Sequence, residues 1–284
     1  MIMHNNKCLV APARSGSTWA CDLLNELDSV VALDEPFSRE DLSKLDVSGF
    51  LDLVEATFQS ERERIIKQKQ AYSTKAVGTK GLGNHYGRVD GQTGLRARQV
   101  DLGLIDIEKE LRPDFTLVCK HTIPFTGVID QLVSRYPTYV LVRNPLAILV
   151  SWNSIDASYR EGRIQPYADA LTGNLTERLN SSNRLERQVR LLEWHFERFL
   201  FVPEERVYRY EDIVTAGLGP LKSIVGPTAQ RKTSPLVAKG VKEMDELLRL
   251  LTKLPKGSPI FSFYDLGSIR ELHERMSSKN MVSA

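Results

Sequence analysis

The chain has 284 residues, of which 42% are hydrophobic, and this length is enough to bury a full core in one large α/β domain, residues 1–284. Its 38 lysines and arginines nearly balance its 36 aspartates and glutamates, for a formal net charge of +2, so the chain has no overall field that would hold a nucleic acid backbone or a lipid surface. The three cysteines form no C-x-x-C pair, which is typical of buried thiols in a reducing compartment: Cys8, Cys21 and Cys119.

Short β-branched runs alternate with longer helical patterns along the chain, which predicts a three-layer α/β fold with a mainly parallel central sheet. The first strand is expected over Lys7–Ala11, and the helix after it carries an apolar stripe of Trp19, Leu23, Leu24 and Leu27. Further strands are predicted over Phe115–Lys120, Thr138–Arg143 and Arg206–Glu211. Helices are predicted over Phe50–Gln70, Pro124–Tyr136, Pro145–Ala157, Thr176–Leu200 and Ser234–Leu254.

The first strand leads into the segment ARSGST, residues 13–18, and then directly into a helix. The free backbone N–H groups at the start of that helix, the helix dipole and the absence of a side chain at Gly16 suit a bound phosphate or sulfate. Arg14 adds a full positive charge, and the hydroxyls of Ser17 and Thr18 are donors for further anion oxygens. The alternative is that Ser17 or Thr18 only caps the helix.

Six glycines in the segment Gly78–Gly94 predict a mobile loop, within a flexible insertion of about residues 73–100. A binding loop over the site and an ordinary disordered insertion both agree with this composition. If the loop covers the site, His85 and Tyr86 are the side chains expected to contact a substrate.

The longest apolar stretch, YVLVRNPLAILVSW at residues 139–152, is interrupted by Arg143, Asn144 and Pro145, so no segment is expected to span a bilayer. The first ten residues lack the long apolar region of a signal peptide. We therefore expect a soluble, cytoplasmic protein.

In the same stretch, residues 139–152, Arg143 ends a strand, Pro145 suits the first turn of the next helix, and Ser151 follows two turns into that helix.

These segments together resemble a known family. PARSGSTW, residues 12–19, is similar to the 5′-phosphosulfate loop of sulfotransferases that use 3′-phosphoadenosine 5′-phosphosulfate (PAPS). Arg143 and Ser151 resemble the pair with which that family binds the 3′-phosphate of the nucleotide. VYRYEDIV, residues 207–214, resembles its tyrosine-glutamate-aspartate segment, in which the tyrosine, here Tyr210, lies near the adenine.

The resemblance implies a P-loop-NTPase-like sulfotransferase fold and a nucleotide site made of Arg14, Ser15, Gly16, Ser17, Thr18, Trp19, Arg143, Ser151 and Tyr210. Cytosolic members also hold the 3′-phosphate with a C-terminal arginine-lysine-glycine element. Its partial matches here are Arg231 with Lys232 and Lys239 with Gly240, and neither is complete.

For catalysis the resemblance implies in-line sulfuryl transfer without a metal ion, in which positioning and charge stabilisation lower the barrier. Arg14 would neutralise the leaving phosphate, and Lys120 would contact the sulfate. Glu35 matches the catalytic glutamate of several bacterial and tyrosylprotein sulfotransferases and is the favoured general base. His121 is the second candidate, although Thr122 occupies the register of the family's histidine. Asp34 is the third candidate, and a carboxylate before Pro36 also suits a turn.

The expected acceptor is the hydroxyl or amine of a small molecule, such as a natural product of bacterial secondary metabolism. Asp34, Glu35 and Asp156 near the site favour a neutral or cationic acceptor. The protein is expected to be a monomer or a homodimer, with PAP, 3′-phosphoadenosine 5′-phosphate, as its nucleotide product.

Two other functions use the same local pattern. A P-loop-like nucleotide kinase or triphosphatase would need the lysine-bearing loop G-x-x-x-x-G-K-[ST], and the segment at residues 11–18 does not have that spacing. A regulator that binds the nucleotide without catalysing transfer would keep the pocket and lack the base.

Overall fold

Five parallel strands form the centre of the fold in a computed structural model of the chain, which describes residues 5–77, 82–173, 175–181, 183–225 and 242–282. The sheet order is β10-β8-β1-β7-β2, and all four strand pairs are parallel. Its strands are β1 (Asn6–Val10), β2 (Val30–Asp34), β7 (Thr116–His121), β8 (Thr138–Val142) and β10 (Val207–Arg209). β2, β7 and β8 are buried along their whole length, as expected of parallel strands covered on both faces.

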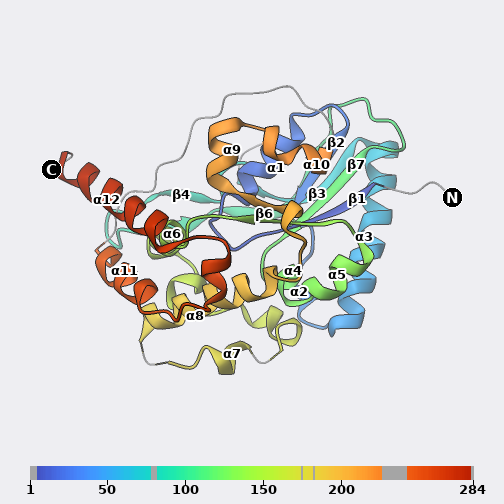
Figure 1. The fold of residues 1–284 in the computed structure, drawn as a ribbon. Coiled ribbons are helices and arrows are strands. Elements are labelled where there is room, and N and C mark those ends of the chain that lie inside the picture. Colours follow the sequence, from blue (N-terminus) through green and yellow to red (C-terminus); the bar gives the residue numbers. More distant parts are fainter. Residues whose placement is uncertain (1–4, 78–81, 174, 182, 226–241, 283–284) are drawn as a thin grey trace.

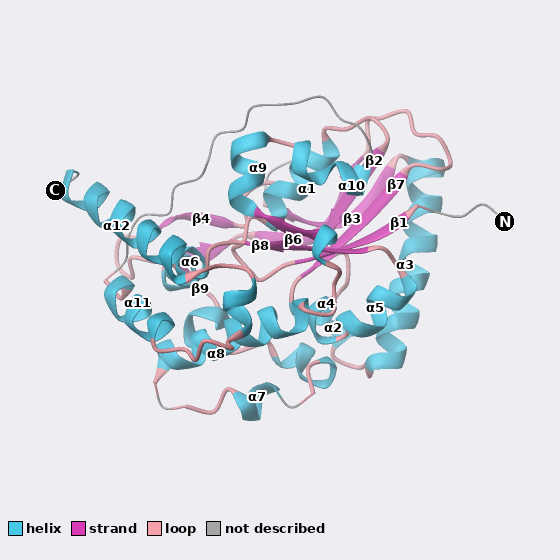
Figure 2. Ribbon diagram, viewed as in Figure 1, coloured by secondary structure: helices cyan, strands magenta, loops and turns pink. Residues whose placement is uncertain are grey.

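Helices cover both faces of this sheet (Figures 1 and 2). On one face lie α1 (Ser17–Asn25), α9 (Tyr210–Ala216) and α10 (Lys222–Val225). On the other lie α4 (Ile123–Gly127), α5 (Ile129–Arg135) and α8 (Arg184–Phe199). The predicted three-layer α/β arrangement around a parallel sheet is therefore confirmed.

The remaining elements surround these layers. The helices are α2 (Arg39–Leu42), α3 (Val47–Gln68), α6 (Pro145–Asn153), α7 (Leu175–Arg178), α11 (Met244–Thr252) and α12 (Leu266–Val282). The strands β3 (Gln70–Ala76) and β6 (Val100–Asp106) form an antiparallel pair. A small sheet joins β4 (Tyr86–Val89), β5 (Arg96–Arg98) and β9 (Ile155–Asp156) in that order.

Strand register brings the carboxyl ends of the central strands to one edge. Asp34 of β2 pairs with Lys120 of β7, and Val10 of β1 pairs with His121 of β7. The loop after β1 therefore starts beside the ends of β2 and β7. In open α/β sheets ligands bind outside this carboxyl edge, so the functional site is expected there.

The structure corrects several predicted boundaries. The loop predicted over Gly78–Gly94 contains β4, and the surrounding insertion of residues 73–100 also contains part of β3 and all of β5. Residues 78–81 lie outside the described residues. The helix predicted over 176–200 is two helices, because Asn183 accepts hydrogen bonds from the N–H groups of Leu185 and Glu186 and starts α8 anew. The helix predicted over 124–136 is α4 and α5, the strand at 206–211 ends at Arg209, and residues 234–241 of the last predicted helix are not described.

Two further expectations concern the described chain as a whole. Cys8, Cys21 and Cys119 are buried and free, as predicted. None of the helices in the described ranges combines the length and the apolar character needed to traverse a bilayer.

Candidate active site

The loop between β1 and α1 takes a conformation that requires glycine at one position. Gly16 has φ 93° and is the N-cap residue of α1. A Cβ atom there would lie 2.4 Å from the ring of Tyr210, so both the backbone and the packing exclude a side chain. Because no side chain caps the start of α1, its first N–H groups are available to a ligand.

The hydroxyl groups of this loop differ from expectation. Thr18 Oγ1 donates to Asp34 Oδ2 at 2.7 Å, so its hydroxyl proton is engaged and only its backbone N–H remains for an anion. Ser15 is fully buried, and its hydroxyl has no hydrogen-bond partner within the described parts of the chain. Ser17 lines the cavity described below. Ser17 and Thr18 are not the helix cap, because Gly16 holds that position.

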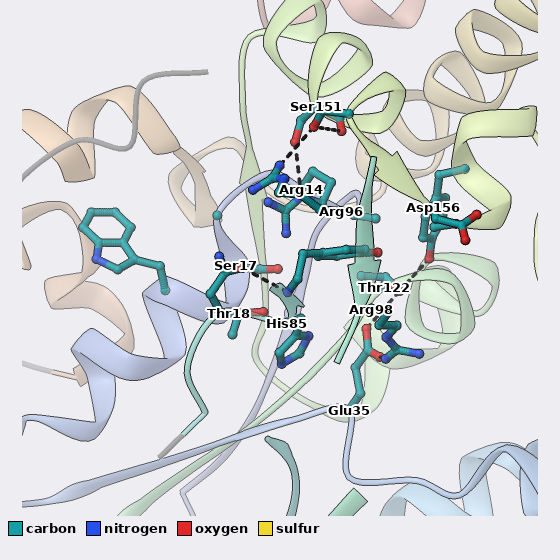
Figure 3. Close-up of a pocket in the computed structure, with 18 of the residues that line it drawn as sticks. Arg14, Ser17, Thr18, Glu35, His85, Arg96, Arg98, Thr122, Ser151 and Asp156 are labelled. Atoms are coloured by element: carbon teal, nitrogen blue, oxygen red, sulfur yellow. Dashed lines mark hydrogen bonds and ion pairs between the residues drawn. The ribbon is translucent and has the colours of Figure 1, made fainter. Parts of the chain in front are cut away.

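The two predicted nucleotide-binding motifs meet at this loop (Figure 3). Arg14 Nε donates to Ser151 Oγ at 3.1 Å, and Arg143 Nη1 donates to the carbonyl oxygen of Arg14 at 3.0 Å. Trp152 Nε1 donates to the carbonyl oxygen of Ala13 at 2.8 Å and holds α6 against the loop. Two segments more than 120 residues apart in the sequence therefore form one site.

Aromatic rings stabilise both arginines. The Arg14 guanidinium lies 4.7 Å from the ring centre of Tyr86, and that of Arg143 lies 4.5 Å from the ring centre of Tyr210, within the range of cation–π attraction. Burial lowers the pKa of Arg14 to about 10, which leaves it charged at neutral pH. Trp19 packs edge-on against Tyr210, with ring centres 5.6 Å apart.

Both arginines, the three aromatic rings beside them and Ser151 line one cavity of about 860 Å³, a size typical of ligand sites. From the nucleotide motifs it reaches Glu35, Lys120 and Thr122 at the ends of β2 and β7. Its lining includes six cationic side chains, Arg14, Arg39, Arg96, Arg98, Lys120 and Arg143, and three carboxylates, Asp22, Glu35 and Asp156.

Lys120 lies between two adjacent carboxylates. Its Nζ is 2.7 Å from Asp34 Oδ1 and 3.2 Å from Glu35 Oε1, and the strand register explains the first contact because Asp34 and Lys120 are paired residues. Burial opposes the charged form of Lys120, but Asp34 and then Glu35 outweigh it and raise its pKa above the ordinary value. The lysine is therefore a fixed positive charge beneath the cavity.

Glu35 differs from Asp34 in its access to the cavity. The Asp34 side chain is completely buried, whereas the Glu35 side chain is 16% exposed and lines the cavity. Burial disfavours the Glu35 carboxylate, but the charges of Lys120 and other neighbouring cations outweigh burial and hold its pKa well below the usual range. Its φ of 47° lies in the left-handed region, a strained conformation that is common at functional sites. Asp34, expected to contact substrate, instead positions Lys120 and Thr18.

His121 faces the core and not the cavity. Its ring stacks on Phe37 with ring centres 5.7 Å apart, and its Nδ1 accepts the N–H of Thr122 at 2.9 Å. Burial lowers its pKa to about 4, so it is neutral at physiological pH. His121 is not among the residues that line the cavity, which argues against it as the alternative base.

The two predicted residues of the glycine-rich insertion, His85 and Tyr86, line the cavity. His85 Nε2 lies 3.4 Å from Asp34 Oδ2, and burial lowers the pKa of this histidine. Tyr86, the first residue of β4, covers Arg14. Whether either contacts a substrate remains a prediction.

Several cavity residues were not predicted from the sequence, among them Arg39, Arg96, Arg98 and Asp22. Arg96 and Arg98 alternate along β5, and both line the cavity; Arg98 Nη2 lies 3.3 Å from Glu35 Oε2, and Arg96 Nη2 donates to Ser154 Oγ at 3.0 Å. Asp22, one turn beyond Thr18 in α1, also lines it. The alternating arginines of R-A-R were the available signal, since alternate residues of a strand share a face.

No protein-family model and no curated protein sequence matches the chain. Within the described ranges, no group of three or more His, Cys, Asp or Glu side chains is arranged to hold a metal ion. The partial C-terminal matches, Arg231 with Lys232 and Lys239 with Gly240, lie outside the described residues.

Proposed function

We propose that the protein is a PAPS-dependent sulfotransferase that transfers the sulfuryl group to a hydroxyl or amine of a small molecule. The observation that carries the proposal is the junction of the two motifs, in which Arg14 bonds Ser151 and Arg143 bonds the Arg14 carbonyl. A nucleotide with phosphates at both its 3′ and 5′ positions needs two neighbouring anion sites, and the contacts between these two motifs support such a pair of sites. The parallel sheet with its anion loop after β1 supports a P-loop-like sulfotransferase fold.

Each part of the nucleotide has a matching group in this proposal. The N–H groups at the start of α1 and the Arg14 guanidinium bind the 5′-phosphosulfate. Arg143 and Ser151 bind the 3′-phosphate. The rings of Trp19 and Tyr210 form an aromatic corner that suits the adenine.

The proposed reaction is one in-line displacement. The acceptor oxygen or nitrogen attacks the sulfur, the bond from sulfur to the bridging phosphate oxygen breaks, and PAP leaves with the electron pair. The acceptor proton passes to the Glu35 carboxylate. Arg14 and the loop N–H groups stabilise the charge on the leaving phosphate, and preorganised donors of this kind contribute about 2 to 4 kcal/mol each.

The ion pair between Lys120 and Glu35 explains how a carboxylate with a low pKa serves as a base. Lys120 lies 3.2 Å from Glu35 and stabilises its charged form. A sulfuryl group in the cavity competes for the same ammonium group, which weakens that contact and raises the proton affinity of Glu35. Asp34 keeps Lys120 in place at 2.7 Å throughout.

Incubation of the protein with ³⁵S-labelled PAPS and a panel of alcohols, phenols and amines tests the proposal. We expect label in an organic product, dependent on the protein. A kinase or triphosphatase would instead bind ATP with magnesium more tightly than PAP, and a regulator would bind PAP without forming labelled product.

A further inference from the structure

We infer that the acceptor carries an acid group, in the simplest case a carboxylate, which Arg98 and Arg39 hold beside Glu35. This inference rests on the proposed function and names its substrate class. It reverses the expectation of a neutral or cationic acceptor, which depended on the acidic residues Asp34, Glu35 and Asp156.

Those acidic residues do not make the acceptor side of the cavity negative. Asp34 is completely buried and is bonded to Lys120 and Thr18. Glu35 contacts both Lys120 and Arg98. Asp156 remains, and it is an exposed residue of β9.

Three cationic side chains are left once the nucleotide is placed. Arg14, Lys120 and Arg143 have roles in binding PAPS, which leaves Arg39, Arg96 and Arg98 in the cavity wall. The carboxylates that remain in the wall, apart from Glu35, are Asp22 and Asp156. Neither Arg39 nor Arg96 has a carboxylate within ion-pair distance among the residues that the structure describes. Because arginine stays charged at all physiological pH values, an anionic ligand is the natural partner.

Arg98 and Arg39 line the same cavity as Glu35. Arg98 makes one contact with Glu35, at 3.3 Å, and the side chain is 24% exposed, so most of its N–H donors remain available to a ligand. Arg39 is exposed and lines the cavity, with its guanidinium 6.0 Å from the ring centre of Tyr167. Glu35, Arg98, Arg39 and Tyr167 all line this one cavity, and we refer to these four residues as a cluster.

The rest of this cluster suits the body of an organic acid. The Tyr159 hydroxyl lies 3.4 Å from Thr122 Oγ1, and the Thr122 hydroxyl donates to Glu35 Oε1 at 3.3 Å. Tyr159 and Tyr167 therefore give the cavity an aromatic wall beside the proposed base. A hydroxy acid bound here would have its carboxylate on the arginines, where a planar fork binds it through paired hydrogen bonds, and its hydroxyl group toward Glu35.

The test compares hydroxy acids with their methyl esters, beginning with 4-hydroxybenzoate and methyl 4-hydroxybenzoate. Binding is measured by calorimetry to the full-length protein saturated with PAP, and kcat/KM is measured with PAPS. The variants are Arg39→Ala and Arg98→Gln. Arg88→Ala is the matched control, because Arg88 is an exposed arginine of β4 in the same small sheet and does not line the cavity.

We expect the wild-type protein to prefer acids over esters by about 10-fold or more in kcat/KM, a difference of about 1.4 kcal/mol. Each cavity variant should reduce that ratio toward one by raising KM for the acid, and Arg88→Ala should leave it unchanged. Arg39 is exposed, so its variant is expected to fold, and PAP binding verifies the folding of both variants.

The inference is overturned if esters match or exceed acids, if the ratio survives both cavity substitutions, or if no carboxylate in the panel binds the PAP-saturated protein. Failure of PAP to bind the wild-type protein would instead count against the proposed function. Normal PAP binding and sulfuryl transfer with no preference for acids would refute this inference alone.

Discussion

Matched substitutions at two neighbouring residues, Glu35→Gln and Asp34→Asn, separate an effect on catalysis from an effect on stability. Glutamine keeps the shape of Glu35 and an oxygen for the Thr122 hydroxyl, which lies 3.3 Å away. Lys120 keeps its shorter bond to Asp34 at 2.7 Å. We therefore expect PAP affinity to be nearly intact and the melting temperature to fall by a few degrees at most.

Turnover should fall much further. Loss of a general base costs about 10²- to 10⁴-fold in rate, which corresponds to about 3 to 5 kcal/mol of barrier. Asp34→Asn should instead lower the stability of the fold much more than Glu35→Gln does. It removes the completely buried partner of a lysine that is 3% exposed, and breaking a buried pair costs about 3 to 5 kcal/mol, or about 10 °C in melting temperature.

Both variants are measured by single-turnover transfer from labelled PAPS, by calorimetry with PAP and by thermal unfolding. Turnover of Glu35→Gln within about 10-fold of the wild-type rate would remove Glu35 from the role of base. A melting temperature that is unchanged in Asp34→Asn would show that the Lys120 ion pair does not stabilise the fold. The low pKa of Glu35 in the free protein further predicts that kcat/KM does not decline until the pH falls below about 4.3.

Three more outcomes follow from the geometry. Arg143→Ala should weaken the binding of PAP by about 10- to 100-fold, the equivalent of a hydrogen bond to a charged group. The affinity for adenosine 5′-phosphosulfate, which lacks the 3′-phosphate, should change little in calorimetry, and equal weakening of both would contradict the assignment. Gly16 has φ 93°, and a Cβ atom there would lie 2.4 Å from the Tyr210 ring. Gly16→Ala should therefore lower the free energy of unfolding by at least about 1 to 2 kcal/mol, the cost of the left-handed backbone alone. Gly91→Ala, where a Cβ atom would meet open space, should be neutral in the same denaturation assay. Burial and then repulsion from Asp34 raise the pKa of Asp22 from its ordinary 3.8 to about 6, so the wild-type protein loses stability as the pH rises from about 3.8 to about 6. Asp22→Asn should melt higher than wild type at pH 8 and equally near pH 4, and equal melting at both would refute the shift.

The positions of the proposed nucleotide-binding residues could be predicted because their signals are local. The segment at 13–18 lies between a strand and a helix, and Arg143 lies between β8 and α6, so each motif identifies its own structural context. What the sequence could not show is the bond between Arg14 and Ser151, which depends on how α6 packs against the loop.

The acceptor side depends on long-range pairing and was missed for that reason. Arg96 and Arg98 enter the cavity because β5 pairs with β9, a strand nearly 60 residues later in the chain. The polar, glycine-rich composition around them predicted only a loop. One error, the choice of His121 as a candidate base, could have been avoided from the sequence alone. Adjacent residues of a strand point to opposite faces, so Lys120 in the cavity already implies that its neighbour His121 faces the core.

A crystal structure of the protein with bound PAP tests the central claim most directly. The proposal predicts that one PAP molecule joins the two motifs, with its 5′-phosphate on the N–H groups of Gly16 to Thr18 and its 3′-phosphate on Arg143 and Ser151. PAP bound at only one of these positions, or outside the cavity, would contradict it.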